Sequence, residues 1–475
     1  MLQTLKNAWK TKDIRNKIIF TFFILVLYRI GTVIPVPFVE ANNFSQYFGD
    51  TILGYMNTLS GGSLATATLF ALGVSPYINA SIIIQLLGVV FPSFGKLARD
   101  DKEKMNFITR IFTVALAIIT ALGYYFLLKK NGMLTNAASP EGNSLFWFYG
   151  IVIVACYVAG ASIIMWLAER INERGIGNGI SMILFANIIS SLPSLVYTLV
   201  AIVIDTFNYP KNAWVYIVVS IVFALVFLAL LVALVIFIIW VTGSERRIPV
   251  QYAKRVVGRK MYGGQSSNLP IKLNMTGVMP IIFASSIVSL VPTILTLCSV
   301  TETTKGFWGT VYRLLATDGI IYPVSLFVLI IAFAYFYTQI TFDPMEVANN
   351  LQKQGGAIPG IRQGRPTADY IRKILGKVTL VGALFLGIIA ILPVILGPHV
   401  ISHLLTWLLS GAIDYDQIAS GWLSIVEMSI KNQVSQLTSV FTFGGTSILI
   451  VVGVAIETFR ELEAQLTMRN YKGFL

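Results

Sequence analysis

The stretch from Ser60 to Leu87, SGGSLATATLFALGVSPYINASIIIQLL, is predicted to lie at membrane depth. It follows an apolar segment that begins near Ile18, but it contains several helix breakers: Gly61, Gly62, Gly73 and Pro76. We therefore expect a short helix at about 52–72, followed by a membrane-crossing helix. Irregular backbone at this depth is tolerated only where protein buries it or where it lines a watery cavity. The short helix is either a re-entrant filler or a small movable element in a pathway.

The composition is that of a multi-pass membrane protein. The 475 residues are 56% hydrophobic and 12% charged, with a mean hydropathy of +0.75, whereas a soluble domain is about one quarter charged. Cys156 and Cys298 lie in apolar segments and imply no disulfide framework. The first apolar run follows a basic tail and no small-residue cleavage site follows it, so we expect it to remain as a membrane anchor.

Apolar runs of about 20 residues predict ten membrane spans. They fall near 18–38, 75–95, 111–128, 146–168, 179–203, 214–241, 273–298, 319–341, 378–397 and 442–458. With a cytosolic N-terminus, 28 of the 35 Lys and Arg residues lie on the cytosolic side. This asymmetry predicts that both termini are cytosolic, because basic residues accumulate in cytosolic loops.

The predicted fold is an all-α polytopic membrane protein with two halves. Five spans fall in 1–208 and five in 209–475, and an odd number of spans in each half makes the halves inverted relative to each other. Proteins built from such inverted halves place their pathway at the interface between them.

Two long basic segments, 242–272 and 342–377, are expected on the cytosolic side. The first contains RRIPVQYAKR, whose alternation predicts a strand or hairpin, and the second is a turn punctuated by Gly and Pro that carries Arg362 and Arg365. Both are either solvated loops or a docking surface for ribosomal RNA or an acidic protein face. Loops of this length and order favour a docking surface.

Catalytic, metal and cofactor sites are not predicted. The chain has no phosphate-binding loop, and GIGNG at 175–179 lies between two apolar spans, where it predicts a tight turn. His399 and His403 are four residues apart but have no evident third metal ligand. Arg29 is a charge inside a span and so a functional candidate, with structural pairing as the alternative.

Six stretches together resemble the SecY family of protein-translocation channel subunits. The likeness runs almost from end to end, and the stretches that carry it are SGGSLATATLFALGVSPYINASIIIQLL (60–87), LAERINERGIGNGIS (167–181), SERRIPVQYAKR (244–255), QSSNLPIKLNMTGVMPIIFASSI (265–287), GAIPGIRQGRPTADYI (356–371) and FGGTSILIVVGVAIET (443–458). The resemblance implies ten helices in two inverted, pseudo-symmetric halves around an hourglass pore. It also implies a channel, not an enzyme, that moves unfolded preproteins across the bacterial cytoplasmic membrane and releases membrane segments into the bilayer.

The resemblance also implies site residues. The pore ring falls on Val74, Ile78, Leu184, Ile188, Ile282 and Ile450, and the plug on about 52–72, including Tyr55, Asn57, Ser60, Gly61 and Gly62. Motor and ribosome docking falls on Arg246, Arg247, Lys254, Arg255, Arg259, Lys260, Arg362 and Arg365. A lateral gate is implied between the second and third spans and the seventh and eighth.

The partners that the resemblance implies are SecE and SecG as further channel subunits, the SecA ATPase, the ribosome, signal sequences, nascent chains and the lipid bilayer. The segment at 398–442 departs from the family pattern, and we expect it to form outer helices on the membrane interface.

Two other functions remain open at this stage. One is a secondary transporter of a small solute, which would place polar or charged ligands at the membrane midplane. The other is a structural membrane scaffold. An aliphatic ring at the midplane favours a polypeptide channel, whereas carboxylates there favour a transporter.

Overall fold

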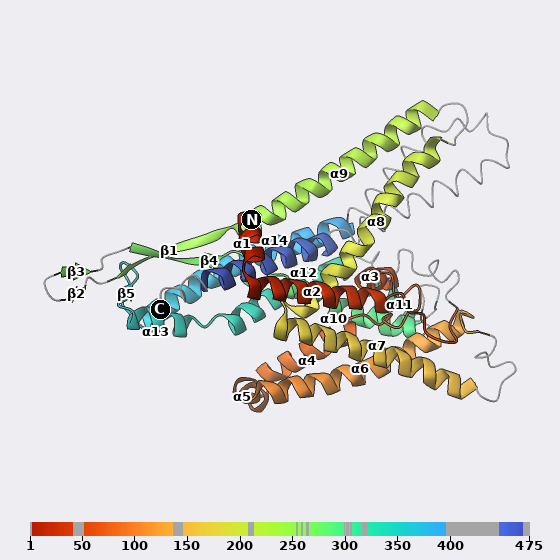
Figure 1. The fold of residues 1–475 in the computed structure, drawn as a ribbon, viewed down its shortest axis with the longest axis horizontal. Helices are drawn as coiled ribbons and strands as arrows, with labels where there is room; N and C mark the ends of the chain where they lie inside the picture. Colours follow the sequence, from red (N-terminus) through yellow and green to blue (C-terminus); the bar gives the residue numbers. More distant parts are fainter. Residues whose placement is uncertain are drawn as a thin grey trace.

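The computed structural model describes residues 2–40, 52–135, 146–207, 213–252, 255–257, 260–262, 266–298, 300, 304, 306–315, 321–395 and 446–468. Most of these residues are helical, and the long helices run roughly along the longest axis of the molecule (Figure 1). The expected outer segment at 398–442, with His399 and His403, lies outside the described residues.

Each expected span coincides with at least part of a helix. In chain order the helices are α1 (Leu2–Lys10), α2 (Lys12–Gly31), α3 (Ile52–Leu59), α4 (Ser75–Val90), α5 (Pro92–Asp100), α6 (Lys102–Lys130), α7 (Phe146–Arg174), α8 (Gly179–Phe207), α9 (Ala213–Gly243), α10 (Met279–Leu297), α11 (Phe307–Leu315), α12 (Ile321–Thr341), α13 (Pro344–Lys353) and α14 (Arg365–Ile395). A last helix covers 446–468 and is called the C-terminal helix below.

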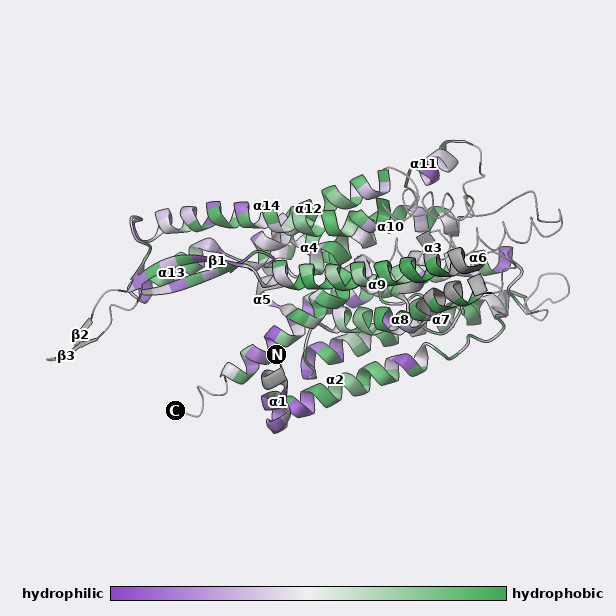
Figure 2. Cartoon of the chain, turned by 90° about the horizontal axis from the view of Figure 1, so that it is seen from above, coloured by the Kyte–Doolittle hydropathy of each residue, from purple (hydrophilic) through white to green (hydrophobic). Residues whose placement is uncertain are grey.

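The helices form an apolar block with polar ends (Figure 2). Six helical segments among the described residues are long and apolar enough to cross a membrane. Five lie in α6, α7, α9, α10 and α14, and the sixth, Ile321–Lys353, covers α12 and α13. Helix α4 and the first part of α8 are apolar but shorter. The structure therefore confirms a mostly helical, membrane-spanning fold, while the count of ten spans and the division at 208 stay predictions.

The short helix before α4 is smaller than expected. Helix α3 ends at Leu59, and 60–74 forms successive turns, so the expectation of a helix over about 52–72 is wrong beyond Leu59. The reason is backbone geometry: Gly61, Gly62 and Gly73 have φ values of +67°, +88° and +57°, which do not continue a right-handed helix. We call 52–74 the plug segment.

The first basic segment, 242–272, forms the predicted strand or hairpin. Strand β1 (Glu245–Tyr252) pairs antiparallel with β4 (Ser266–Lys272), and the tip holds the short pair β2 (Arg255–Val257) and β3 (Lys260–Tyr262). Strand β5 (Gly356–Ala357), from the second segment, pairs with the other edge of β1, giving the order β4-β1-β5. The sheet projects from the end of the bundle where the N-terminus lies (Figure 1).

The main core lies where the two predicted halves meet. One cluster of buried apolar side chains draws on α2, α4, α7 and α8 from the first half and on α9, α10, α12, α14 and the C-terminal helix from the second. A second cluster holds the plug segment against α6 and α7. Close packing of this buried apolar surface holds the helices of the two clusters in fixed positions relative to one another.

Candidate functional site

The six predicted ring residues meet in one apolar cluster at the centre of the bundle. Their exposed fractions are between 1% and 3%. Val74 and Ile78 lie at the start of α4, Leu184 and Ile188 on α8, Ile282 on α10 and Ile450 on the C-terminal helix. Each of the two i,i+4 pairs presents one helix face, because residues four apart lie above one another. The predicted ring residues are therefore buried aliphatic side chains that share one apolar cluster, and their role as a pore ring stays a prediction.

A cavity of about 690 Å³ adjoins this cluster. Its walls come from α3, α4, α6, α8, α10 and the C-terminal helix, and all ring residues except Ile188 line it. Its polar groups are hydroxyls and the amide of Asn79, and none of the described residues lining it is Asp, Glu, Lys or Arg. No group of three or more His, Cys, Asp or Glu residues in the described ranges has the arrangement of a metal site. This chemistry does not support the small-solute transporter.

The plug segment closes one side of the cavity through Met56, Leu59 and Ser60. Two of its predicted residues brace its own turn: the Asn57 carboxamide oxygen accepts from the amide of Ala65 at 2.8 Å, and the Ser60 hydroxyl donates to the Asn57 carbonyl at 3.0 Å. The structure describes the backbone of Tyr55 but not its side chain. The turns after α3 are therefore internally fixed, not loose coil.

The plug segment is attached mainly to helices of the first half. The hydroxyl of Tyr124 on α6 donates to the Leu64 carbonyl at 2.5 Å, and that of Tyr157 on α7 donates to the Ala67 carbonyl at 3.4 Å. Helix α7 comes so close at Gly160 that an added Cβ would stand 2.0 Å from the Leu69 carbonyl oxygen.

The second half contributes a contact from α10, where the Thr293 hydroxyl lies 3.1 Å from the Met56 sulfur. The plug segment thus contacts both predicted halves, and most of its hydrogen bonds to other helices come from the first half.

The predicted gate surfaces are in contact. Helix α10 packs against α4, α6 and α12. The Tyr337 hydroxyl on α12 donates to the Gln85 side-chain oxygen on α4, and the Phe283 ring on α10 lies 5.1 Å from the Tyr337 ring, centroid to centroid. Gln85 also donates to the Ser81 hydroxyl at 3.0 Å. The Tyr337–Gln85 hydrogen bond therefore joins the two faces, whereas the aromatic contact between Phe283 and Tyr337 lies within the face formed by α10 and α12.

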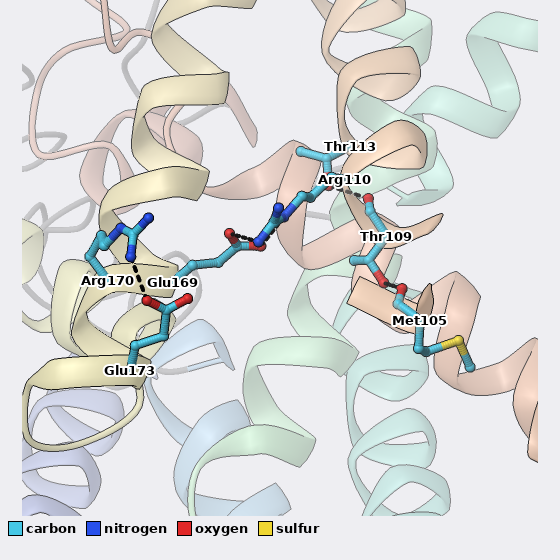
Figure 3. A network of polar contacts seen from close by, with 7 residues as sticks. All are labelled: Met105, Thr109, Arg110, Thr113, Glu169, Arg170 and Glu173. Atoms are coloured by element: carbon cyan, nitrogen blue, oxygen red, sulfur yellow. Dashed lines mark hydrogen bonds and ion pairs between the residues drawn. The ribbon is translucent and has the colours of Figure 1, made fainter. Parts of the chain in front are cut away.

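An ion pair joins the neighbouring helices α6 and α7 (Figure 3). The Arg110 guanidinium makes two parallel contacts with Glu169, at 2.9 and 2.8 Å. Arg170 pairs with Glu173 within α7 at 2.6 Å. The Arg110 side chain is 47% exposed, so solvent weakens the pair, and its main contribution is the fixed orientation that a two-pronged contact gives.

Four of the predicted docking residues lie on or beside the three-stranded sheet, which we call the sheet platform. Arg246 and Arg247 are exposed on β1, Arg362 is exposed in the turn between β5 and α14, and Arg365 is exposed at the first position of α14. The pairing of β5 with β1, at Gln251–Ala357, joins the two basic segments. Lys254 and Arg259 lie outside the described residues, and for Arg255 and Lys260 the structure describes the backbone strands only.

The platform has its own apolar core. Ile248 and Val250 of β1, Ile271 of β4, and Leu351 and Ile371 of the second segment are buried together. Partial burial, together with the nearby Arg460, lowers the pKa of Lys272 at the end of β4. A packed core and a paired strand distinguish this region from two solvated loops.

The comparisons with known proteins agree with this geometry. The SecY family profile matches residues 68–459. The protein translocase subunit SecY of Streptomyces galbus is 38% identical over 486 aligned residues that cover 100% of both chains.

The chain belongs to the SecY family.

Solved SecY-family structures share the fold. A SecY structure described as showing a plug domain that stabilises the closed channel has a TM-score of 0.60 at 17% identity, covering 95% of this chain and 92% of that one. Sec61 in a canine ribosome–channel complex has a TM-score of 0.53 at 15% identity, with the same coverage of both chains. This SecY-family chain is a multi-pass membrane protein.

The sequence of this SecY-family chain predicted the turn at 175–179, but the polar contact made by Asn187 was not predicted from it. GIGNG forms the expected turn between α7 and α8, and the amide of Gly177 in it donates to Glu461 on the C-terminal helix at 2.8 Å. The fully buried Asn187 on α8 was not singled out, although an amide inside an apolar span is a visible signal. The Asn187 side chain reaches the plug segment.

Proposed function

We propose that this chain is the channel subunit of a protein translocase. It conducts unfolded preproteins across the bacterial cytoplasmic membrane and lets apolar segments leave sideways into the bilayer. The observation that carries the proposal is the ring: six branched aliphatic side chains from four elements meet at the interface of the predicted halves. The sequence of the Streptomyces galbus translocase subunit, aligned over its whole length, supports the same role.

The chemistry of the ring suits a polypeptide in transit. A narrow aliphatic constriction expels water and so blocks ions when it is closed. It offers no hydrogen-bond donor or acceptor that would hold a passing chain, and its side chains change rotamer to fit different residues. The plug segment, which bounds the adjoining cavity, adds a second barrier that moves away for each substrate.

Sideways release needs a wall that opens. In this proposal, α4 and α6 separate from α10 and α12, which breaks the contact of Tyr337 with Gln85 and exposes the cavity to lipid. The cavity is mostly apolar, so it accepts the hydrophobic stretch of a signal sequence.

The sheet platform is the proposed cytosolic docking site. Its exposed arginines suit ribosomal RNA or an acidic surface of the SecA ATPase. SecE and SecG are the proposed further subunits of the channel complex. The excess of Lys and Arg in alternate loops supports cytosolic termini.

The test is reconstitution. Proteoliposomes containing the chain with SecE and SecG receive SecA, ATP and a preprotein, and the protease-protected preprotein is measured. We expect protection that depends on ATP and on the signal sequence. A matched reaction uses the same preprotein without its signal sequence. Protection no greater than in liposomes lacking the chain would overturn the proposal.

A further inference from the structure

Asn187 connects the ring helix to the plug segment. Its side chain on α8 is fully buried, and its amide nitrogen donates to the Leu59 carbonyl, at the end of α3, at 2.7 Å. Leu59 is the last residue of α3, so its carbonyl has no partner within that helix. Asn187 therefore supplies the hydrogen bond that the end of the plug helix lacks.

Gly61 lies against the same polar group. A Cβ at Gly61 would stand 2.8 Å from the Arg29 Nη1, 2.9 Å from the Asn187 carboxamide oxygen and 3.2 Å from the Ser190 hydroxyl. These three side chains come from α2 and α8 and surround the turn that follows α3. Only a residue without a side chain fits between them, and the φ of +67° at Gly61 favours glycine as well.

Arg29 places a positive charge at the C-terminal end of α3. The carbonyl end of a helix is its negative pole, so a cation there is favourable. The Arg29 Nη1 is buried and has no hydrogen-bond partner among the described residues. Its charge therefore acts on the end of α3 and on the turn at Gly61.

Asn187 is also next to the ring. Ile188 follows it directly, and Leu184 lies one helical turn before it on α8. A passing polypeptide that pushes these two aliphatic side chains outward moves the same turn of α8 that carries the Asn187 amide. A hydrogen bond weakens steeply when its length or angle departs from the optimum.

We infer that Asn187, assisted by Arg29, is the residue that couples widening of the ring to release of the plug segment. With the ring closed, Asn187 holds the end of α3 in place. With the ring widened, the displacement of α8 breaks this hydrogen bond, and the plug segment leaves. The inference rests on the proposed function, because only a channel that opens needs such coupling.

The test is chemical cross-linking between the plug segment and α10 in resting membranes. The starting chain carries Cys156→Ser and Cys298→Ser, with Met56→Cys and Thr293→Cys added, because those two side chains touch. A short bifunctional thiol reagent then reports how often the plug segment is docked. Asn187→Ala removes the hydrogen bond, and Asn187→Leu removes it while keeping a side chain with the same branching and the same number of heavy atoms.

The matched control is Ser162→Ala on α7, whose hydroxyl bonds within its own helix to the Val158 carbonyl at 2.8 Å. One hydrogen bond corresponds to a change of about twofold to tenfold in an equilibrium. We therefore expect both Asn187 variants to lower the ratio of docked to undocked plug segments by about that factor, and so to lower the initial cross-linking rate relative to the control. A translocating substrate should lower the rate in the parent chain and add little in the variants.

Three outcomes separate the claims. Cross-linking rates in both Asn187 variants equal to that of Ser162→Ala would overturn the coupling role. If only Asn187→Ala slows cross-linking, packing and not the hydrogen bond is responsible, and the inference is also overturned. Failure of the parent chain to translocate a preprotein would instead overturn the proposed function. The two failures can be told apart, because the cross-linking rates in resting membranes are measured without a substrate.

Discussion

Gly160 provides a direct test of how tightly the plug segment is docked. In Gly160→Ala the added Cβ would stand 2.0 Å from the backbone carbonyl oxygen of Leu69. Carbon and oxygen atoms do not approach so closely, and backbone cannot rotate away as a side chain can. Helix α7 and the plug segment must therefore separate by about 1 Å or more to restore normal contact distances.

The magnitude follows from two opposing terms. Overpacking of this kind costs about 1–3 kcal/mol, whereas replacing Gly by Ala inside a helix favours folding by about 1 kcal/mol. The docked state should therefore lose up to about 2 kcal/mol, which is up to about a thirtyfold fall in the ratio of docked to undocked chains. Two measurements report it: resting ion conductance in planar bilayers, which should rise, and the apparent melting temperature in detergent, which should fall.

The control for this experiment is Gly376→Ala on α14. A Cβ there would meet no atom within 4 Å, so only the helix term remains and the melting temperature should stay the same or rise. Equal melting temperatures and equal conductances for the two variants would refute the argument that α7 and the plug segment are in close contact.

Three further changes test other parts of the site. Arg362→Glu reverses an exposed charge on the platform and should abolish SecA-driven translocation while the chain still inserts into the membrane; an unchanged rate in proteoliposomes would contradict docking there. Ile248→Ala removes a side chain that is 2% exposed, so the platform should lose about 2–5 kcal/mol and become more sensitive to protease, whereas the exposed Pro249→Ala should have little effect. The third change replaces four ring residues with serine: Ile78, Leu184, Ile282 and Ile450. The serine hydroxyls should hold water and raise resting ion leakage, and an unchanged conductance would mean that the native side chains only pack.

The sequence predicted the elements whose signals are local. Apolar runs located the helices, and the alternation in RRIPVQYAKR located β1, because both patterns repeat over several residues. The ring positions came from the resemblance to the SecY family; burial alone would not separate Ile282 from other packed isoleucines. The end of α3 was placed too late: Gly61 and Gly62 are recognisable helix breakers, but only their φ values show that the helix ends before them.

The sequence did not predict the contacts between segments that are far apart in the chain. The pairing of β5 with β1 joins residues about a hundred positions apart, and two residues of β5 carry no recognisable strand pattern. The contact of Asn187 with Leu59 likewise depends on how α8 packs beside α3. A lone amide in an apolar span indicates that a partner exists, but it does not say which one.

The attachment of the sheet determines where an applied force enters the molecule. Strand β1 begins directly after α9, β4 leads into α10, and β5 lies between α13 and α14, so every connection runs into the second half. A force applied to the sheet is therefore transmitted directly to the predicted second half only. A motor that pulls or twists the sheet would turn the entire channel unless the predicted first half is held from outside. Any partner that applies force to the sheet platform therefore requires the predicted first half to be anchored. The surrounding membrane or a second contact with the same motor could provide this anchorage.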